Sequence, residues 1–154
     1  MRILGVDPGL KKTGYALLDN MKLLKWGIIT SNSDWKSSIV EITDALEKKI
    51  ADLNPQHIAI ESPFSGINPS SSFKLAHLRG AIIYMAKKQG IEVYDYSPAK
   101  VKKVITGRGN ASKNEVRNFI GKIFKQISGF DEADAIAIAF THFLEKQHDR
   151  KIKG

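Results

Sequence analysis

The chain of 154 residues is 42% hydrophobic, which suits one domain with a buried core and argues against disorder. It has no cysteine, so disulfides and thiolate metal sites are excluded, and a metal would need oxygen or histidine ligands. Its net charge of +8, from 24 basic and 16 acidic residues, favours a polyanionic partner such as nucleic acid.

The first third of the chain predicts a β-meander followed by a helix. Three apolar runs predict strands, over residues 1–6, 14–19 and 22–30. Only Asn20 and Met21 separate the last two runs, as in an antiparallel hairpin. Apolar residues then recur at helical spacing over 39–53, with Ser37 and Ser38 as candidate N-caps, and an Asn-Pro pair ends this helix.

The rest of the chain alternates strands with helices. The pattern predicts strands over 57–61 and 91–97, a loop over 62–72, and helices over about 73–90, 98–106, 113–123 and 131–147. Ser97 is a candidate N-cap, and Ser112 with Glu115 fits a capping box. A meander followed by strand–helix alternation predicts an α/β fold, a single domain over 1–154 with a five-stranded mixed sheet flanked by helices.

Four acidic residues stand where such a fold gathers functional groups. Asp7 and Glu61 end the first and fourth predicted strands, and they would share one crevice if these strands are parallel neighbours. Asp131 and Asp134 are three residues apart, hence on one face of the last helix. Converging carboxylates repel one another unless cations bind, and an all-oxygen site suits two Mg²⁺ ions that hydrolyse a phosphodiester. With the basic charge, this predicts a nuclease.

Each acid also has a structural explanation when taken alone. Asp7 opens an Asp-Pro-Gly turn sequence, Glu61 fits a solvated strand end, and Asp131 fits a helix cap. Asp134 is harder to explain in this way, because it lies within an alanine-rich helix beside a core face. The four histidines show no metal-ligand spacing, and His142 is expected on a helix surface or in the core. The joint pattern of acids is therefore more specific than any one of them.

Five stretches of the chain, in order, are similar to one known family. They are GVDPGLKKTGYAL, IAIESPF, SSFKLAHLRGAI, YSPAKVKKVITGRGNASKNEV and DEADAIAIAFTH. On these motifs the chain resembles the bacterial RuvC-type Holliday-junction resolvases, which are nucleases with a ribonuclease-H-like fold. The resemblance implies a homodimer that cuts opposed strands of a four-way DNA junction in recombination and repair. A branch-migration motor complex is a further candidate partner.

The resemblance also implies a cofactor and its ligands. It points to two Mg²⁺ ions per active site, with Mn²⁺ able to substitute. The residues that match the family's catalytic, metal-holding acids are Asp7, Glu61, Asp131 and Asp134. For Asp131 two roles stay open, metal ligand or general base.

Basic and aromatic residues complete the expected site. Lys102 and Lys113 match family lysines near the DNA, and Lys113 is expected near the scissile phosphate. Phe64 matches an aromatic residue that stacks on junction bases, although a loop aromatic folded onto the core is the structural alternative. Arg79 and Arg108 are further candidate DNA contacts. A solvated helix face is the structural alternative for the lysines.

Other functions are compatible with parts of the pattern. The main alternative is another ribonuclease-H-like, metal-dependent nuclease with a different nucleic-acid substrate, because the acids fix the chemistry but not the substrate's shape. An ATPase of the actin and sugar-kinase type would need a second domain with its own phosphate loop, and a non-catalytic DNA-binding module would not need four acids. Without a signal peptide or a membrane-spanning apolar run, a cytoplasmic location is expected.

Overall fold

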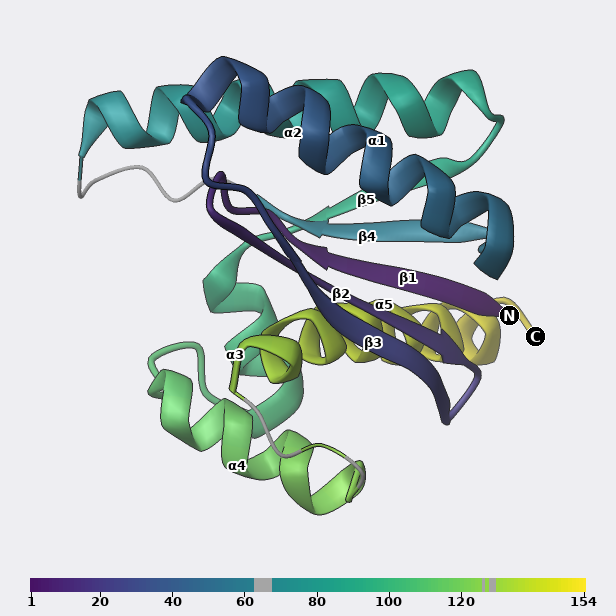
Figure 1. Ribbon diagram of the computed structural model, residues 1–154. Helices are drawn as coiled ribbons and strands as arrows, with labels where there is room; N and C mark the ends of the chain where they lie inside the picture. Colours follow the sequence, from purple (N-terminus) through teal and green to yellow (C-terminus); the bar gives the residue numbers. More distant parts are fainter. Residues whose placement is uncertain (63–67, 126, 128–129) are drawn as a thin grey trace.

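The described strands form one five-stranded sheet in a computed structural model that describes residues 1–62, 68–125, 127 and 130–154. The strands are β1 (Arg2–Asp7), β2 (Lys12–Asp19), β3 (Lys22–Thr30), β4 (His57–Glu61) and β5 (Glu92–Tyr96). Their order is β3-β2-β1-β4-β5, with β1–β2 and β2–β3 antiparallel and β1–β4 and β4–β5 parallel (Figure 1). The predicted mixed sheet and the predicted hairpin are confirmed.

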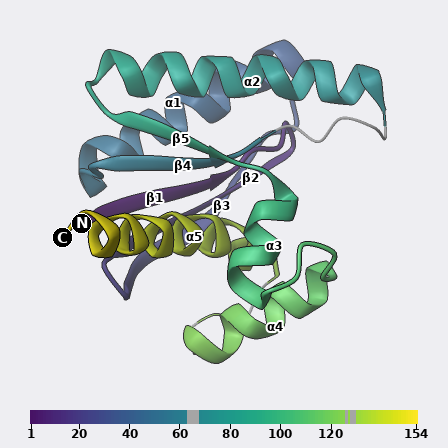
Figure 2. The ribbon, with the colours of Figure 1, turned by 180° about the vertical axis from the view of Figure 1, so that it is seen from behind.

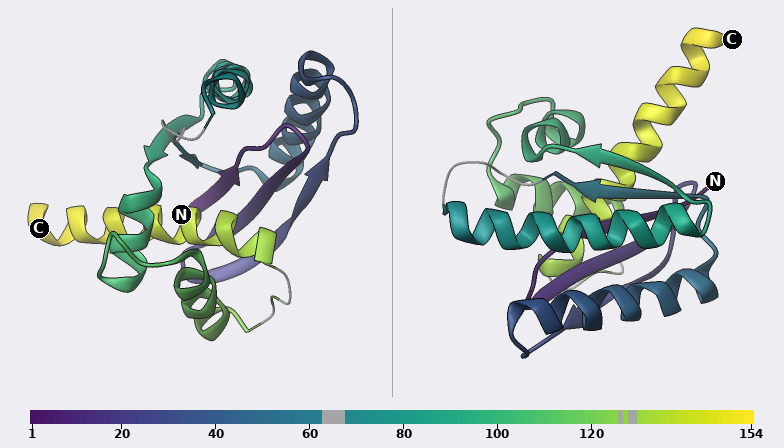
Figure 3. Two further views of the ribbon diagram at one scale, coloured as in Figure 1. Left: turned by 90° about the vertical axis from the view of Figure 1, so that its left-hand side faces the viewer. Right: turned by 90° about the horizontal axis from the view of Figure 1, so that it is seen from above.

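Helices cover both faces of this sheet. They are α1 (Trp35–Leu53), α2 (Pro69–Lys88), α3 (Pro98–Thr106), α4 (Lys113–Ile123) and α5 (Phe130–Lys153). Helices α1 and α2 lie side by side on one face, and α5 crosses the other face with α3 and α4 beside it (Figures 1 and 2). The end-on view shows the resulting three layers (Figure 3). None of the helices described has the length and hydropathy required to cross a membrane.

Alternation along the strands builds two separate hydrophobic clusters. In β1, Ile3 packs in the cluster on the α5 face, whereas Leu4 and Val6 pack in the cluster under α1 and α2. The same division holds in β4, where Ala59 faces α5 and Ile60 faces the opposite side. The central strands are therefore buried on both faces, as expected for parallel strands covered by helices.

Two helix starts follow the sequence prediction, and one corrects it. Ser97 caps α3, and Ser112 with Glu115 forms the predicted capping box of α4. Helix α1 begins earlier than expected, because the Asp34 carboxylate accepts hydrogen bonds from two main-chain N–H groups of its first turn. Neither Ser37 nor Ser38 is the N-cap; both lie within the helix, and the buried Ser38 hydroxyl is hydrogen-bonded to Ser31.

Two further helices are longer than predicted. Helix α2 begins at Pro69, within the segment expected to be a loop, because Asn68 accepts hydrogen bonds from main-chain N–H groups and proline suits the first helical position. Helix α5 continues past the predicted end at 147 to Lys153, since its polar last turns contain no glycine or proline that would stop it.

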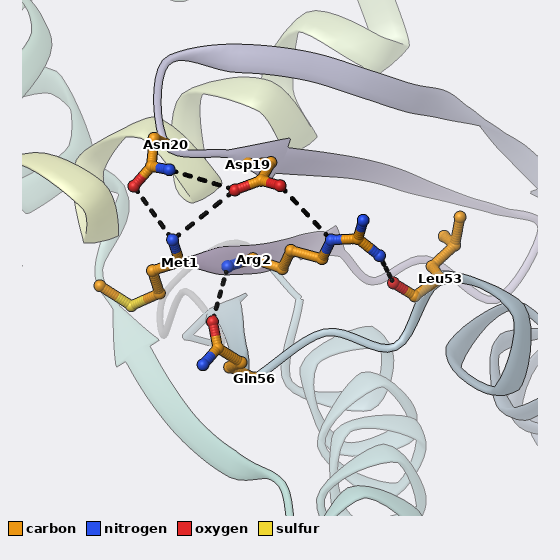
Figure 4. Close-up of polar contacts among 6 residues, drawn as sticks. All are labelled: Met1, Arg2, Asp19, Asn20, Leu53 and Gln56. Atoms are coloured by element: carbon orange, nitrogen blue, oxygen red, sulfur yellow. Dashed lines mark hydrogen bonds and ion pairs between the residues drawn. The ribbon is translucent and has the colours of Figure 1, made fainter.

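The start of β1, at the end of the strand opposite Asp7, is anchored by polar contacts. The Met1 ammonium group donates to Asn20 at 3.0 Å and lies 3.6 Å from an Asp19 carboxylate oxygen (Figure 4). The Arg2 guanidinium group donates to the carbonyl oxygen of Leu53 at 3.1 Å. These contacts tie the start of the strand to the β2–β3 turn and to the end of α1.

A buried polar cluster lies beneath α5 at the start of β4. His57 Nδ1 is 2.9 Å from His142 Nε2, and the Tyr96 hydroxyl is 2.7 Å from His142 Nδ1. Tyr94 packs on the His142 ring at a centroid distance of 4.4 Å. His142 is fully buried, so of the two positions expected for it, helix surface or core, the structure has the core. We call these four residues the histidine–tyrosine cluster.

Candidate active site

Asp7 and Glu61 end neighbouring parallel strands, as the sequence analysis required for a shared site. Val6 is paired with Ile60 in the β1–β4 ladder, so the next residues, Asp7 and Glu61, lie side by side at the carboxyl ends of the two strands. Side chains alternate along strands, so both acids share the face of Ala59, which packs toward α5. The two carboxylates therefore project into the same region, beneath the start of α5.

Helix α5 reaches this region because Gly5 lets it approach β1 closely. A Cβ atom at position 5 would overlap the carbonyl oxygen of Ala135 and lie 2.8 Å from the Cβ of Ala139. The alanines of α5 are buried, so no large side chain separates the helix from the strand at this point. Asp134, the neighbour of Ala135, is thereby brought to the hollow that Glu61 lines.

The raised pKa of Glu61 indicates that other acidic residues lie close to it. Burial raises the pKa of Glu61 to about 7; the nearby charges of Asp7 and Asp134 add to this, while Lys113 and Lys102 oppose it. Burial and the other acids favour the neutral form of this carboxyl group, whereas a bound cation would favour its charged form. We call Asp7, Glu61 and Asp134 the acid cluster.

Two hollows give access to the acid cluster. The first, of about 340 Å³, is lined by Glu61, Pro98, Val101, Lys102, Lys113, Val116, Asp134 and Ala137. The second, of about 290 Å³, is lined by Asp7, Pro8, Glu61, Ser62, Asn68, Ser71, Ser72 and Leu75. Glu61 is common to both, and the two predicted lysines lie in the first. The structure thus brings Asp7, Glu61, Asp134, Lys102 and Lys113 together from β1, β4, α5, α3 and α4.

The two predicted arginines lie in different surroundings. Arg79 is largely buried, donates to the main-chain carbonyl of Glu61 at 3.0 Å and pairs with the Asp95 carboxylate. These contacts hold α2 to the ends of β4 and β5. Arg108 is exposed in the loop between α3 and α4, where it forms a 2.8 Å ion pair with Glu115. Contact of either arginine with DNA stays a prediction.

A residue that sequence reasoning missed contacts the acid cluster directly. Arg117 of α4 donates from Nε to one oxygen of Asp134 at 3.2 Å and from Nη2 to the other at 3.0 Å. The signal in the sequence was its position four residues after Lys113, which places both on one face of α4. The partner on α5 could not be identified from that spacing.

Two predicted site residues fall outside what the structure describes. Phe64 lies in the undescribed segment after β4, and Asp131 lies in α5 with only its backbone described. Among the side chains that are described, no three acids or histidines lie close enough together to form a complete metal site. The pairing of Asp134 with Arg117 accounts for part of this arrangement, because both oxygens of that carboxylate are turned toward the guanidinium group.

Comparison with known proteins identifies the family. Residues 3–142 match the family described as "Crossover junction endodeoxyribonuclease RuvC". A protein of that name from Prosthecochloris aestuarii is 38% identical over 154 residues, covering 94% of this chain and 82% of the relative. The chain belongs to the RuvC family. A RuvC protein from Cytophaga hutchinsonii is 34% identical, covering 99% of this chain and 80% of that relative.

Solved RuvC structures have the same fold. The Thermus thermophilus RuvC structure superposes with a TM-score of 0.85 at 25% identity, covering 96% of this chain and 97% of that one. T. thermophilus RuvC in complex with a Holliday junction substrate gives a TM-score of 0.84 at 26% identity, with 96% of both chains covered. The predicted ribonuclease-H-like fold is therefore confirmed, and the RuvC resemblance inferred from the five motifs is correct.

Proposed function

We propose that this protein is a structure-selective endonuclease that resolves four-way DNA junctions by paired, metal-dependent phosphodiester hydrolysis. The observation that carries the proposal is the acid cluster, in which β1, β4 and α5 of a RuvC-family chain each contribute one carboxylate beside two lysines. The net charge of +8 suits a polyanionic substrate. One of the solved relatives is a RuvC bound to a Holliday junction, which supports the choice of substrate.

The donor set of the acid cluster fits hard divalent cations. RuvC nucleases are metal-dependent, and we propose two Mg²⁺ ions per site, with Mn²⁺ able to substitute. Asp7, Glu61 and Asp134 would hold them together with Asp131, which would be a ligand or a general base. When bound, the ions would supply activation of the attacking water and stabilisation of the leaving oxygen. The raised pKa of Glu61 supports this assignment, since a cation would compensate the burial and the repulsion that raise it.

The basic and aromatic residues would position the DNA. Lys113 and Lys102 line the same hollow as Glu61 and Asp134, so their ammonium groups would attract the scissile phosphate toward the acids. Arg108, exposed in the loop between α3 and α4, would contact the DNA backbone that flanks the cut. Phe64 would stack on an unpaired base at the junction centre, because it follows Glu61 by three residues.

A symmetric junction requires two active sites, so we propose that the protein is a homodimer. Phe73 and Tyr84 of α2 are 63% and 68% exposed, and Phe73 is in edge contact with His77. These aromatic side chains would form part of the interface, with the two sites related by a two-fold axis. Sedimentation equilibrium with and without junction DNA tests this proposal, and a monomer under both conditions would contradict paired incision. A branch-migration motor complex in a cytoplasmic recombination pathway would be a further partner.

The deciding experiment compares substrates under one condition. With Mg²⁺, the protein should cut a mobile four-way junction by paired nicks, and should leave a linear duplex and an RNA–DNA hybrid intact. Asp7→Asn should bind the junction but cut it slower by orders of magnitude, because it retains shape and loses a charged ligand. Preferential cleavage of the hybrid or the duplex would support the alternative nuclease with a different substrate.

A further inference from the structure

The peptide unit that follows β4 is held at both of its polar atoms. The main-chain N–H group of Ser62 donates to the carbonyl oxygen of Tyr96 at 2.9 Å, next to the ladder between β4 and β5. The carbonyl oxygen of Glu61, in the same peptide unit, accepts a hydrogen bond from Arg79 Nε at 3.0 Å. Because a peptide unit is planar, these two contacts together fix its orientation.

Arg79 is largely buried and is itself held in place. Its side chain is only 12% exposed, and its Nη2 atom pairs with the Asp95 carboxylate of β5. The guanidinium group is planar and always charged, so the contact with Asp95 sets the direction in which Nε points. Arg79 lies near the middle of α2, so one rigid group joins this helix to the ends of β4 and β5.

Arg79 reaches Glu61 from the side of the sheet opposite its carboxylate. Helix α2 packs with Ile60 in the cluster on one face of the sheet, whereas the side chain of Glu61, the next residue, projects toward α5. The described residues that line the two hollows include Glu61 but not Arg79. An effect of Arg79 on catalysis would therefore act through the main chain of Glu61 and not through contact with the metal ions.

We propose that Arg79 is a positioning residue that holds the main chain of Glu61, so that the carboxylate meets Asp7 and Asp134 around the metal ions. This inference rests on the proposed function, because it takes Glu61 to be a metal ligand. The β-ladders hold the chain before the Cα atom of Glu61 and the fixed peptide unit holds it after, so the direction of the side chain is set from both sides. Loss of a group that orients a metal ligand costs about 10- to 100-fold in metal affinity or activity.

The test measures how Arg79→Met depends on metal, because methionine is long and unbranched but cannot donate a hydrogen bond. Its Kd for Mn²⁺, titrated by calorimetry without DNA, should rise about tenfold or more above that of the unmodified protein. Junction cleavage at low Mn²⁺ should fall by a similar factor, and excess Mn²⁺ should restore most of it, since the displaced carboxylate is still present. Glu61→Gln lacks the charged ligand, so excess Mn²⁺ should not restore its cleavage.

Two further variants keep the result interpretable. Lys48→Met removes the same charge from an exposed position of α1, and its Mn²⁺ affinity should stay unchanged, which excludes a general effect of net charge. Arg79→Lys keeps the charge but loses the planar, two-pronged donor, so its Kd should lie between those of Arg79→Met and the unmodified protein. If Arg79→Met fails to fold, as judged by circular dichroism, Arg79→Lys provides the test, and a Kd equal to that of the unmodified protein would overturn the inference.

Junction binding separates this role from a direct contact with DNA. With a chelator present, Arg79→Met should bind the junction with the Kd and the salt dependence of the unmodified protein, whereas a lost phosphate contact would weaken binding and lower the salt slope by about one. An unchanged Mn²⁺ Kd in folded Arg79→Met would overturn this inference alone, whether or not stability or DNA binding changes. Mn²⁺ binding and cleavage that survive Glu61→Gln unchanged would overturn the proposed metal site, and the inference with it.

Discussion

The acid cluster and the histidine–tyrosine cluster both draw residues from β4 and α5, at different positions along each element. Strand β4 begins at His57 and ends at Glu61, and helix α5 carries Asp134 two turns before His142. In the histidine–tyrosine cluster His142 is hydrogen-bonded to His57 and to Tyr96, and burial lowers the pKa of His142 to about 4. In the acid cluster, burial and like charges raise the pKa of Glu61 to about 7.

The two clusters have different roles: the histidine–tyrosine cluster contributes to stability and the acid cluster to function. Both ring nitrogens of the buried His142 are used in contacts within the protein, so this residue needs no ligand, and the contacts hold α5 to the sheet. A cluster of like charges destabilises the fold until a ligand of opposite charge binds. The gathering of acids at this place therefore points to a positively charged ligand. Helix α5 thus carries His142 in a cluster that is closed within the protein and, two turns earlier, Asp134 in a cluster that is open to a substrate.

The largest expected effect is the loss of catalysis in the acid cluster. Glu61→Gln should slow junction cleavage by about three orders of magnitude, because a metal ligand contributes several kcal/mol and each 1.4 kcal/mol is about tenfold in rate. Its melting temperature should not fall, since the variant removes a repelled carboxylate. Glu92→Gln, which alters an exposed acid on β5, is the matched control and should cut normally. Equal cleavage rates for Glu61→Gln and Glu92→Gln would contradict the assignment of catalysis to the acid cluster.

Gly5→Val should damage both clusters together. The new side chain would collide with the backbone of α5 at Ala135, and α5 carries Asp134 and His142. The free energy of unfolding should fall by at least about 3 kcal/mol, and cleavage should fall with it, because helix backbone cannot move aside as a flexible side chain can. Gly80→Ala in α2 meets no atom within 4 Å and should leave the stability unchanged or slightly higher. Chemical denaturation and a cleavage assay measure both.

His142→Leu should affect stability and leave the chemistry intact. The substitution leaves the Tyr96 hydroxyl and a His57 nitrogen without their buried partner, which costs about 3 kcal/mol and lowers the melting temperature by roughly 10 °C. Cleavage well below the melting temperature should stay close to that of the unmodified protein. His148→Leu, an exposed histidine on the same helix, serves as the control. A strong loss of cleavage in folded His142→Leu would show that the two clusters are coupled.

The smallest effect, and the sharpest comparison, is the opposite pH dependence of the two clusters. Glu61 has a raised pKa, so the folded protein binds the extra proton and loses stability as the pH rises from 4.5 to about 7. His142 has a lowered pKa, so the unfolded chain binds the extra proton and stability rises from about pH 4 to 6.5. His57, whose pKa is also lowered, acts in the same direction as His142.

Substitution of Glu61 or of His142 removes the titrating group of one cluster. The dependence of stability on pH in each variant should therefore reflect the other cluster. Measured with a chelator present, Glu61→Gln should gain stability with rising pH relative to the unmodified protein, and His142→Leu should lose it. Each difference should be about 2–3 kcal/mol across the window, since one pKa unit corresponds to about 1.4 kcal/mol. Parallel pH profiles for all three proteins would contradict the assignment of these pKa values.

The sequence alone determined the features that depend on neighbours in the chain. The capping box of Ser112 and Glu115, the β2–β3 hairpin and the alternation in β1 all arise from contacts within a few residues, so local spacing predicts them. The RuvC resemblance and the four acids were found in the same way, as short motifs. The start of α2 was missed because its serine-rich first turn resembles a loop, and only the Asn68 cap with the proline that follows distinguishes it.

Only the tertiary structure decided which distant residues meet. The Arg117–Asp134 pair joins residues 17 apart, and the His57–His142 contact joins residues 85 apart. Which groups meet across such separations depends on strand order and on how closely α5 approaches β1, and both result from packing of the whole sheet. The acids indicate the chemistry within short motifs of the sequence. The positive charge that pairs with Asp134 comes from Arg117 on another helix, and local spacing in the sequence cannot specify that contact.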